Sequence, residues 1–280
     1  MQNITALAEK NKIVFSGVTG LDLDATLHCG QAFRWSQKTE DGFASVVCGR
    51  RVFADTDGDS LIIKGEGVEN DVEAFRRYFD LGRDYDEIKN LLSTDLVMRK
   101  AITYSPGIRI LNQDPWEALG SFIFSSNNNI ARISGMIEKF CALFGKPAAG
   151  GGYCFPSVER VAGLDRADLA PLKCGYRDEY ILDAARRIAS GLLSLDDVAA
   201  APLGDAREML MSIRGVGPKV ADCALLFGFG RVDAFPADVH INRVMRNCFP
   251  NGLPEYARPY AGIAQQYLFH WARTGEHAMV

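Results

Sequence analysis

The sequence lacks several patterns that would assign it quickly to a class of protein. It contains no run of about 18 apolar residues, which a membrane-spanning helix needs. Its N-terminus lacks the basic-then-apolar pattern that is typical of a secretory signal. It has neither a Cys-x-x-Cys pair nor two histidines at metal-ligand spacing. We therefore expect an intracellular protein without a membrane segment, located in the cytoplasm or nucleoid if the source is prokaryotic.

The cysteines form no recognisable framework either. There are seven of them, an odd number, and they are scattered along the chain at Cys29, Cys48, Cys141, Cys154, Cys174, Cys223 and Cys248. Small secreted domains instead have even numbers of cysteines at regular spacing. This pattern indicates reduced thiols and gives little support for disulfides or a structural zinc site.

Excess positive charge is also missing. The net charge is −4, which argues against indiscriminate binding of polyanions, because phosphate neutralisation needs clustered Lys and Arg. Local charge matters more than the sum, however. Basic side chains gather in residues 207–246, at Arg207, Arg214, Lys219, Arg231, Arg243 and Arg246. A DNA-binding surface in that region is therefore compatible with the composition.

The 280 residues divide into two parts by the period of their apolar residues. Short β-type segments with Asp-Gly punctuation come first, at 13–15, 32–35, 43–49 and 60–64. From Val72 onward the apolar spacing becomes helical, and nearly everything after Pro115 has that spacing. We predict an α+β protein: an N-terminal antiparallel sheet domain with a few helices over 1–105, then a predominantly helical domain over 106–280.

The most informative stretch is Met211–Arg243, in which two apolar segments flank a Gly-Val-Gly turn. Gly215 and Gly217 can take positive φ and expose backbone amides, and a helix opens at Pro218. Amides and the positive end of a helix together form an anion site that suits a DNA phosphate. A helix–turn–helix corner that needs glycine only for its geometry explains the pattern equally well.

Lys219 and Asp238 stand at two helix starts in this stretch. A solvated, protonated lysine is the usual state of this side chain. A helix N-terminus and burial both disfavour the ammonium form, so Lys219 is also a candidate amine nucleophile. Asp238 fits a helix N-cap, and a carboxylate there can also act on developing positive charge.

Several separated motifs resemble one family. The segments 215–223 and 232–240 resemble the helix–hairpin–helix DNA glycosylase superfamily. Segments 30–35, 125–132, 175–177 and 259–265 are similar to 8-oxoguanine DNA glycosylase/AP lyase, and the resemblance runs from about residue 13 to about residue 272. Arg214 departs from it, since eukaryotic members usually have proline there, and this change should add positive charge near the phosphate.

The resemblance implies the chemistry of the site. Lys219 attacks the anomeric carbon of a nucleotide, displaces the base and forms a Schiff base, from which β-elimination cuts the strand. Asp238 stabilises positive charge on the deoxyribose or helps to deprotonate Lys219. Cys223 and Phe269 pack on the two faces of the extruded base. By spacing alone, Cys223 is simply a small buried side chain.

Recognition of the base and its partner strand is implied by the same likeness. Gln265 reads the Watson–Crick edge, and the carbonyl of Gly30 accepts the hydrogen that 8-oxoguanine carries on N7. Without the resemblance, Gly30 is an ordinary turn glycine, and Gln265 with Phe269 is an amphipathic pair. The resemblance also implies that Asn127 fills the hole left by the flipped base and that Arg132 and Arg177 hydrogen-bond the orphaned cytosine. It further implies that Tyr176 inserts into the duplex as a wedge and that His240 contacts a phosphate.

We therefore expect a monomeric base-excision repair enzyme that removes 8-oxoguanine from duplex DNA, preferably opposite cytosine, with coupled lyase activity. No cofactor is expected: no cysteine follows Cys248, which excludes the iron–sulfur cluster of some relatives. The family allows a cation at the hairpin carbonyls, although no side chain indicates it. Two alternatives stay open, a glycosylase for another base such as an alkylated purine, and a non-catalytic hairpin module that grips the DNA backbone.

Overall fold

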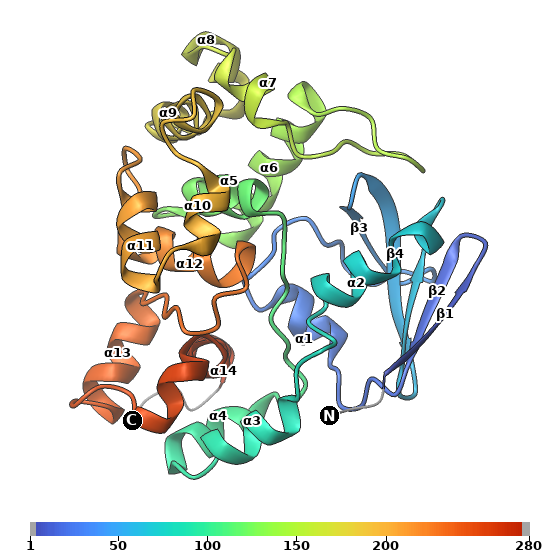
Figure 1. The fold of residues 1–280 in the computed structure, drawn as a ribbon, viewed down its shortest axis with the longest axis vertical. Coiled ribbons are helices and arrows are strands. Elements are labelled where there is room, and N and C mark those ends of the chain that lie inside the picture. The colour runs from blue at the N-terminus through green and yellow to red at the C-terminus, as the bar shows by residue number, and fades with distance from the viewer. Residues whose placement is uncertain (1–3, 276–280) are drawn as a thin grey trace.

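The N-terminal part is built on one antiparallel sheet, in a computed structural model that describes residues 4–275. Its strands follow the order β1-β2-β5-β4-β3 (Figure 1). Alternation along the strands puts apolar residues on one face, and cross-strand partners such as Ile13 and Ile63 are both fully buried. The strands are β1 (Thr5–Glu9), β2 (Lys12–Ser16), β3 (Phe43–Val47), β4 (Arg50–Asp57) and β5 (Ser60–Lys64).

Short helices accompany the sheet. The apolar side of α2 closes the sheet core, because Phe75 and Tyr78 belong to the same buried cluster as the strands. Asp84 and Asp95 accept backbone hydrogen bonds at the starts of the next two helices, as their sequence positions favour. These elements are α1 (Leu23–His28), the 3₁₀ turn η1 (Val68–Asp71), α2 (Val72–Tyr78), α3 (Tyr85–Leu92) and α4 (Leu96–Tyr104).

The remainder of the chain is helical, which confirms the predicted α+β class. Pro115 begins the central helix after Asp114, whose side chain accepts from the amide of Glu117 at 2.9 Å. The helices are α5 (Pro115–Ser125), α6 (Ile130–Phe144), α7 (Val158–Ala162), α8 (Arg166–Leu169), η2 (Ala170–Leu172), α9 (Arg177–Ala189), α10 (Leu195–Ala200), α11 (Leu203–Met211), α12 (Pro218–Gly228), α13 (Val239–Cys248), η3 (Glu255–Tyr260) and α14 (Ala261–Thr274).

One predicted strand is wrong. Residues 32–35 belong to no strand, and the nearest ladder contact is the amide of Ser36 to the carbonyl of Ala44 at 2.8 Å. Their alternation has a different cause. Phe33 is buried in the helical core, whereas Trp35 is buried in the sheet core. The segment therefore crosses between the two apolar clusters, with Ala32 and Trp35 in the sheet core and Phe33 in the helical core.

The two clusters do not follow chain order throughout. Apolar residues of α3 and α4 belong to the helical core, and α4 packs against α14 near the far end of the chain. At the centre, α5 and α12 pack closely, because Gly228 brings the backbone of α12 next to Pro115. Among residues 4–275, none of the helices is both long enough and apolar enough to span a bilayer.

Candidate active site

The turn between α11 and α12 is the hairpin that the sequence predicts. Gly215 has φ +78°, and a Cβ at this position would overlap the ring of Tyr180. Gly217 does not use the positive φ that is open to glycine, since it is extended at φ −95° and ψ −180°. Extended backbone is normal for a helix N-cap, and Gly217 holds that position in α12. A Cβ on Gly217 would meet nothing within 4 Å, so the space above this amide is open.

The helix start itself is available to an anion. Among the described residues, no side chain caps the N-terminus of α12. The first amides of a helix have no partner within the helix, and they carry the positive end of its dipole. The open space above Gly217 therefore lies next to uncapped donors, which is the arrangement that a phosphate needs.

Arg214 ties the hairpin to α9. Its backbone amide donates to Asp183 at 2.8 Å, and its guanidinium pairs with Glu179 at 2.8 Å. Glu179 also accepts from Arg166 at 2.6 Å. The charge that Arg214 adds beside the hairpin is thus shared with a carboxylate, while its side chain stays 67% exposed. The departure from the family pattern consequently places an ion pair next to the turn.

The amine of Lys219 is held between α12 and the end of α5. Its Nζ donates to Oγ of Ser125 at 3.3 Å and lies 5.1 Å from the ring centroid of Phe122. Oγ of Ser125 in turn donates to the carbonyl of Phe122 at 2.8 Å. Lys219 is half-buried and Ser125 is buried. The amine is therefore fixed against an aromatic face and a hydroxyl rather than free in solvent.

Cys223 lies one turn further along the same face of α12, and it is buried. Burial raises the pKa of its thiol to about 11, while the nearby charge of Lys219 acts in the opposite direction. The group is consequently a neutral thiol at pH 7, and it presents a small apolar surface beside the amine.

Asp238 caps α13, as its sequence position predicts. Its Oδ1 accepts from the amide of Ile241 at 2.9 Å. Its negative charge raises the pKa of the Cys223 thiol slightly, so the carboxylate of Asp238 lies near that thiol. The structure records no ion pair between Asp238 and Lys219 within residues 4–275, so the cap holds this carboxylate independently of the amine.

Residues from opposite ends of the chain meet beside this centre. Gly30 has φ +92°, and a Cβ there would lie 3.2 Å from Cε1 of Phe269. The ring of His240 lies edge-on to Phe269, with 6.2 Å between centroids. Gln265 is buried one turn before Phe269 in α14, and its Oε1 has no hydrogen-bond partner in the described part of the chain. A buried acceptor without a partner is costly unless a ligand meets it.

A second group of predicted residues lies where two loops meet. Arg177 is buried, and its guanidinium donates to the carbonyls of Ser126 and, at 3.1 Å, Asn127. The same guanidinium lies over the ring of Tyr176, 4.7 Å from its centroid. Arg177 thus fixes the loop that follows α5.

The exposed members of this group surround that anchor. Asn127 is exposed and has φ +47°, an uncommon conformation that asparagine tolerates better than most residues. Tyr176 is 46% exposed. Arg132, in the first turn of α6, is exposed and donates to the carbonyl of Lys173 at 3.3 Å. Asn127, Arg132 and Tyr176 are therefore accessible to a ligand, whereas Arg177 is engaged within the protein.

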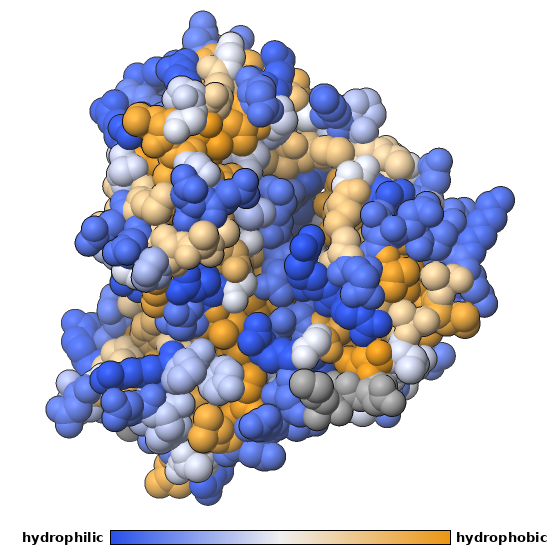
Figure 2. Space-filling view, in the orientation of Figure 1, coloured by the Kyte–Doolittle hydropathy of each residue, from blue (hydrophilic) through white to orange (hydrophobic). Residues whose placement is uncertain are grey.

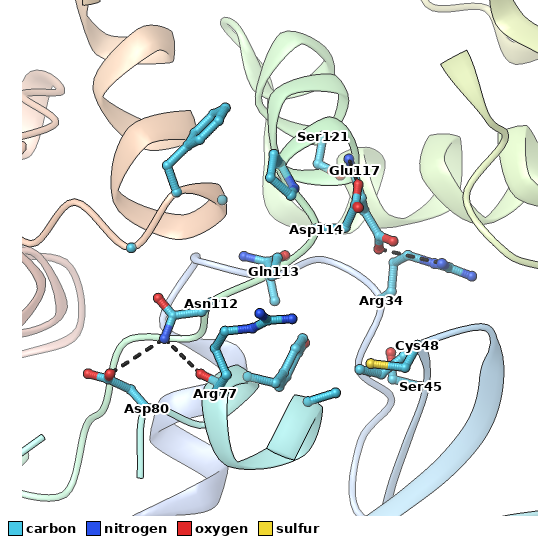
Figure 3. A pocket seen from close by; sticks show the side chains of 18 of the residues that line it. Arg34, Ser45, Cys48, Arg77, Asp80, Asn112, Gln113, Asp114, Glu117 and Ser121 are labelled. Carbon is cyan, nitrogen blue, oxygen red and sulfur yellow. Dashed lines mark hydrogen bonds and ion pairs between the residues drawn. The ribbon is translucent and has the colours of Figure 1, made fainter. Parts of the chain in front are cut away.

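A cavity of about 650 Å³ lies elsewhere, between the sheet and the helical part. Its lining includes Arg34, Asn112 and Glu117 but none of the residues predicted for the site (Figure 3). Figure 2 shows the surface hollowed there, and the lining mixes polar residues such as Arg34 with apolar residues such as Trp35. Phe33 also lines this cavity and packs edge-on against Phe122, which touches the lysine. The cavity therefore lies two rings away from the amine of Lys219 and does not contain it.

Sequence reasoning assigned no role to two residues that hold the amine. They are Ser125 and Phe122 of α5. Because this helix is apolar almost throughout, its sequence indicated only a core position for them. The available signal was a hydroxyl at the end of an otherwise apolar helix. Within residues 4–275, no group of three or more His, Cys, Asp or Glu side chains could hold a metal ion.

Comparisons with known proteins identify relatives over the whole fold. Residues 13–119 match the family of the 8-oxoguanine DNA glycosylase N-terminal domain. Residues 121–255 match the HhH-GPD superfamily of base excision DNA repair proteins. The N-glycosylase/DNA lyase of Saccharomyces cerevisiae is 34% identical over 81% of this chain and 68% of its own length. The probable N-glycosylase/DNA lyase of Methanothermobacter thermautotrophicus is 33% identical over 72% and 74%.

A solved structure is similar over nearly every residue. It is the 8-oxoguanine glycosylase/lyase of Clostridium acetobutylicum in complex with double-stranded DNA that contains cytosine opposite 8-oxoguanine. The TM-score is 0.89 at 32% identity, and the match covers 98% of this chain and 99% of that chain.

Proposed function

Because the chain belongs to the 8-oxoguanine DNA glycosylase family of the HhH-GPD superfamily, we propose that it excises 8-oxoguanine from duplex DNA, preferably opposite cytosine. The enzyme class is a bifunctional DNA N-glycosylase and DNA lyase of base excision repair. The observation that carries the proposal is the half-buried amine of Lys219, held at an uncapped helix start beside an open glycine turn.

Lys219 supplies the nucleophile in this proposal. Its neutral amine forms a bond to C1′ of the damaged nucleotide, and the bond from C1′ to the base breaks, with the electron pair leaving on the base. One of the two amine protons goes to the departing base. The other goes to O4′ as the C1′–O4′ bond breaks, and the opened sugar becomes a Schiff base with the lysine nitrogen. Loss of a proton from C2′ then expels the 3′ phosphate, which cuts the strand. Phe122 and Ser125 keep the amine in place for these steps.

Asp238 acts on the charge that develops in the sugar. A carboxylate near C1′ stabilises the positive charge that builds up as the base leaves, and it can also accept a proton from the lysine. Its bond to the amide of Ile241 fixes one oxygen and leaves the other free to act. The cap and the catalytic role are therefore compatible.

The base is recognised by a pocket of four residues. Phe269 and Cys223 pack on its two faces, and the amide of Gln265 reads its Watson–Crick edge. The carbonyl of Gly30 accepts the N7 hydrogen of 8-oxoguanine and repels the lone pair that guanine has at N7. The unpartnered, buried Oε1 of Gln265 supports this assignment, because a guanine-type edge offers the donors that it lacks.

The duplex is opened and held by the second group. Tyr176 inserts as a wedge between stacked bases, and Asn127 fills the space that the flipped base leaves. Arg132 and Arg177 donate hydrogen bonds to the cytosine that has lost its partner. Arg177 donates to protein carbonyls in this structure, so reading a cytosine requires that it give up at least one of those bonds. His240 contacts a phosphate near the lesion.

The hairpin takes a second phosphate through the amides at Gly215 and Gly217. The family also allows a cation at the hairpin carbonyls. The carbonyls of Arg214, Gly215 and Val216 accept no hydrogen bond from the described residues, which leaves oxygen ligands of the kind that a hard cation takes. A cation held there would add positive charge facing the DNA phosphate.

We also propose that the protein acts as a monomer inside the cell, with the domain division at residue 105. The test of the function is product analysis on 8-oxoguanine duplexes with each of the four bases opposite. The proposal expects base release and strand cleavage to be fastest opposite cytosine. Release of an alkylated purine but not of 8-oxoguanine would contradict it, and so would tight binding of undamaged duplex without any cleavage.

A further inference from the structure

The backbone next to Gly30 is held by side chains from the last helix. Gly30 follows directly after α1, whose terminal carbonyls need partners from outside the helix. Nε2 of Gln266 donates to the carbonyl of Cys29 at 3.1 Å. Nη2 of Arg273 donates to the carbonyl of His28 at 3.1 Å. Two side chains of α14 thus fix the two peptide groups that precede Gly30, and we name Gln266 and Arg273 the Gly30 clamp.

The other side of Gly30 is fixed by a buried amide. Gln31 is completely buried, and its Nε2 donates to the carbonyls of Thr26 and Arg109, each at 2.8 Å. Its Oε1 accepts from the amide of Leu111 at 2.8 Å. The backbone carbonyl of Gln31 accepts from Nε2 of Gln113 at 2.7 Å, at the wall of the cavity in Figure 3. The turn is therefore anchored on both sides.

These contacts leave one carbonyl unused. In residues 28–31, the carbonyls of His28, Cys29 and Gln31 each accept from a side chain. The carbonyl of Gly30 accepts no hydrogen bond from the described residues. Gly30 and the neighbouring ring of Phe269 are both half-buried, so a ligand or water can reach this carbonyl. The anchoring side chains thus hold this acceptor in a fixed direction while leaving it free.

The same helix also carries the rest of the proposed base pocket. Gln265 and Phe269 lie in α14 one turn apart, and Gln266 and Arg273 alternate with them. Arg273 lies over the ring of Phe269, 5.3 Å from its centroid. One rigid element therefore sets where the Gly30 carbonyl stands relative to the groups that pack on and read the base.

From this geometry we propose that Gln266 and Arg273 are positioning residues that set the discrimination between 8-oxoguanine and guanine. The inference rests on the proposed function, in which the Gly30 carbonyl meets position N7 of the base. The favourable hydrogen bond to 8-oxoguanine and the repulsion of guanine both depend steeply on distance and angle. A loosened turn lets the carbonyl move away from N7. The affinity for 8-oxoguanine then decreases, and so does the repulsion that disfavours guanine.

The experiment compares two substrates of the same enzyme under single-turnover conditions, both opposite cytosine: an 8-oxoguanine duplex and an abasic-site duplex. The abasic strand has no base, so its cleavage requires the fold, the hairpin and Lys219 but not the Gly30 carbonyl. Methionine resembles glutamine in size but has no donor. Gln266→Met and Arg273→Met should each lower 8-oxoguanine excision about tenfold and leave abasic cleavage within about twofold.

Two further variants serve as controls. Arg273→Lys keeps a charged donor and should retain most of the 8-oxoguanine rate. Tyr267→Phe removes a neighbouring bond of the same helix, from the Tyr267 hydroxyl to the carbonyl of Ile108 at 3.1 Å, and should leave both rates unchanged. A parallel loss on both substrates in the methionine variants would show a merely structural role and overturn the proposal.

Equilibrium binding gives a readout that is independent of turnover. Binding is measured in a Lys219→Gln background. Each methionine variant should lower about tenfold the ratio of the Kd for the guanine duplex to the Kd for the 8-oxoguanine duplex. An unchanged Kd ratio, or unchanged excision of 8-oxoguanine, would overturn the role of the Gly30 clamp. Either result would leave the proposed function standing. A wild-type enzyme that cleaves the abasic strand but leaves 8-oxoguanine in place overturns the proposed function and the clamp with it.

Discussion

The amine of Lys219 donates a hydrogen bond to the hydroxyl of Ser125 over 3.3 Å, across the junction of α12 and α5. This hydroxyl gives its own hydrogen to the carbonyl of Phe122, so it meets the lysine with a lone pair. The nucleophile is therefore oriented by a helix that is distant from it in sequence.

Ser125→Ala should slow excision of 8-oxoguanine, because the amine loses the acceptor that directs it. We expect a decrease of about tenfold in the single-turnover rate, which corresponds to the loss of one hydrogen bond that orients the nucleophile. Ser121→Ala is the matched control, one turn earlier in α5, since this serine lines the cavity of Figure 3 and does not bond the amine of Lys219. Equal rates for wild type and Ser125→Ala would remove this serine from the site.

Two substitutions of Asp238 separate its cap from its charge. Asparagine is as good an N-cap as aspartate, so Asp238→Asn should keep the melting temperature and lower turnover by about 100-fold or more. Asp238→Ala should in addition lower the free energy of unfolding by about 1 kcal/mol. Thermal melts and single-turnover kinetics measure the two effects. Unchanged turnover in Asp238→Asn would leave this residue with a capping role only.

The two hairpin glycines should respond differently to alanine. Gly215→Ala places a Cβ in positive φ and against the ring of Tyr180, so it should lower the free energy of unfolding by about 1–3 kcal/mol. Gly217→Ala fits its extended backbone and open surroundings, so stability should hold. The added methyl group stands where a phosphate would approach, and the Kd for duplex DNA should rise several-fold. Equal effects of the two variants on stability and on DNA binding would contradict this division.

Buried thiols should make the fold sensitive to alkali. Burial raises the pKa of Cys29 and of Cys223 to about 11, from an ordinary value of 9.0. The native state therefore keeps these protons at pH values where the unfolded chain loses them. The stabilisation is complete below about pH 9 and is lost as the pH rises through about 11, on the order of 1–3 kcal/mol for each thiol.

Urea unfolding between pH 8 and pH 11 measures this dependence. The double variant Cys29→Ser, Cys223→Ser has no thiol at either position. Its free energy of unfolding should fall less over this interval than that of the wild type, whatever its stability at pH 8. Parallel curves for the two proteins would show that these thiols do not carry the effect.

Local signals explain what the sequence predicts well. Asp238 caps its helix as predicted, because a cap depends on residues three positions apart. The segment 32–35 was predicted wrongly, since a short run of apolar residues can enter two separate cores without pairing as a strand. The sequence alone does not decide the conformation of Gly217, because Gly-x-Gly allows positive φ but does not require it.

Long-range contacts mark the limit of sequence reasoning. The family resemblance brings Gly30 and Phe269 into one site, and the structure places them in contact range. Nothing in the sequence pairs Gln266 with Cys29, which is 237 positions away. Such bonds depend on how two helices from opposite ends of the chain meet, and no periodicity encodes that meeting.

The central claim is that Lys219 forms a covalent Schiff base with the damaged nucleotide. Borohydride reduces such a base to a stable cross-link, so trapping on an 8-oxoguanine·cytosine duplex tests the claim directly. Wild-type protein should give a covalent protein–DNA adduct, and Lys219→Gln should give none. Equal trapping by the two proteins would contradict the assignment of this lysine as the nucleophile.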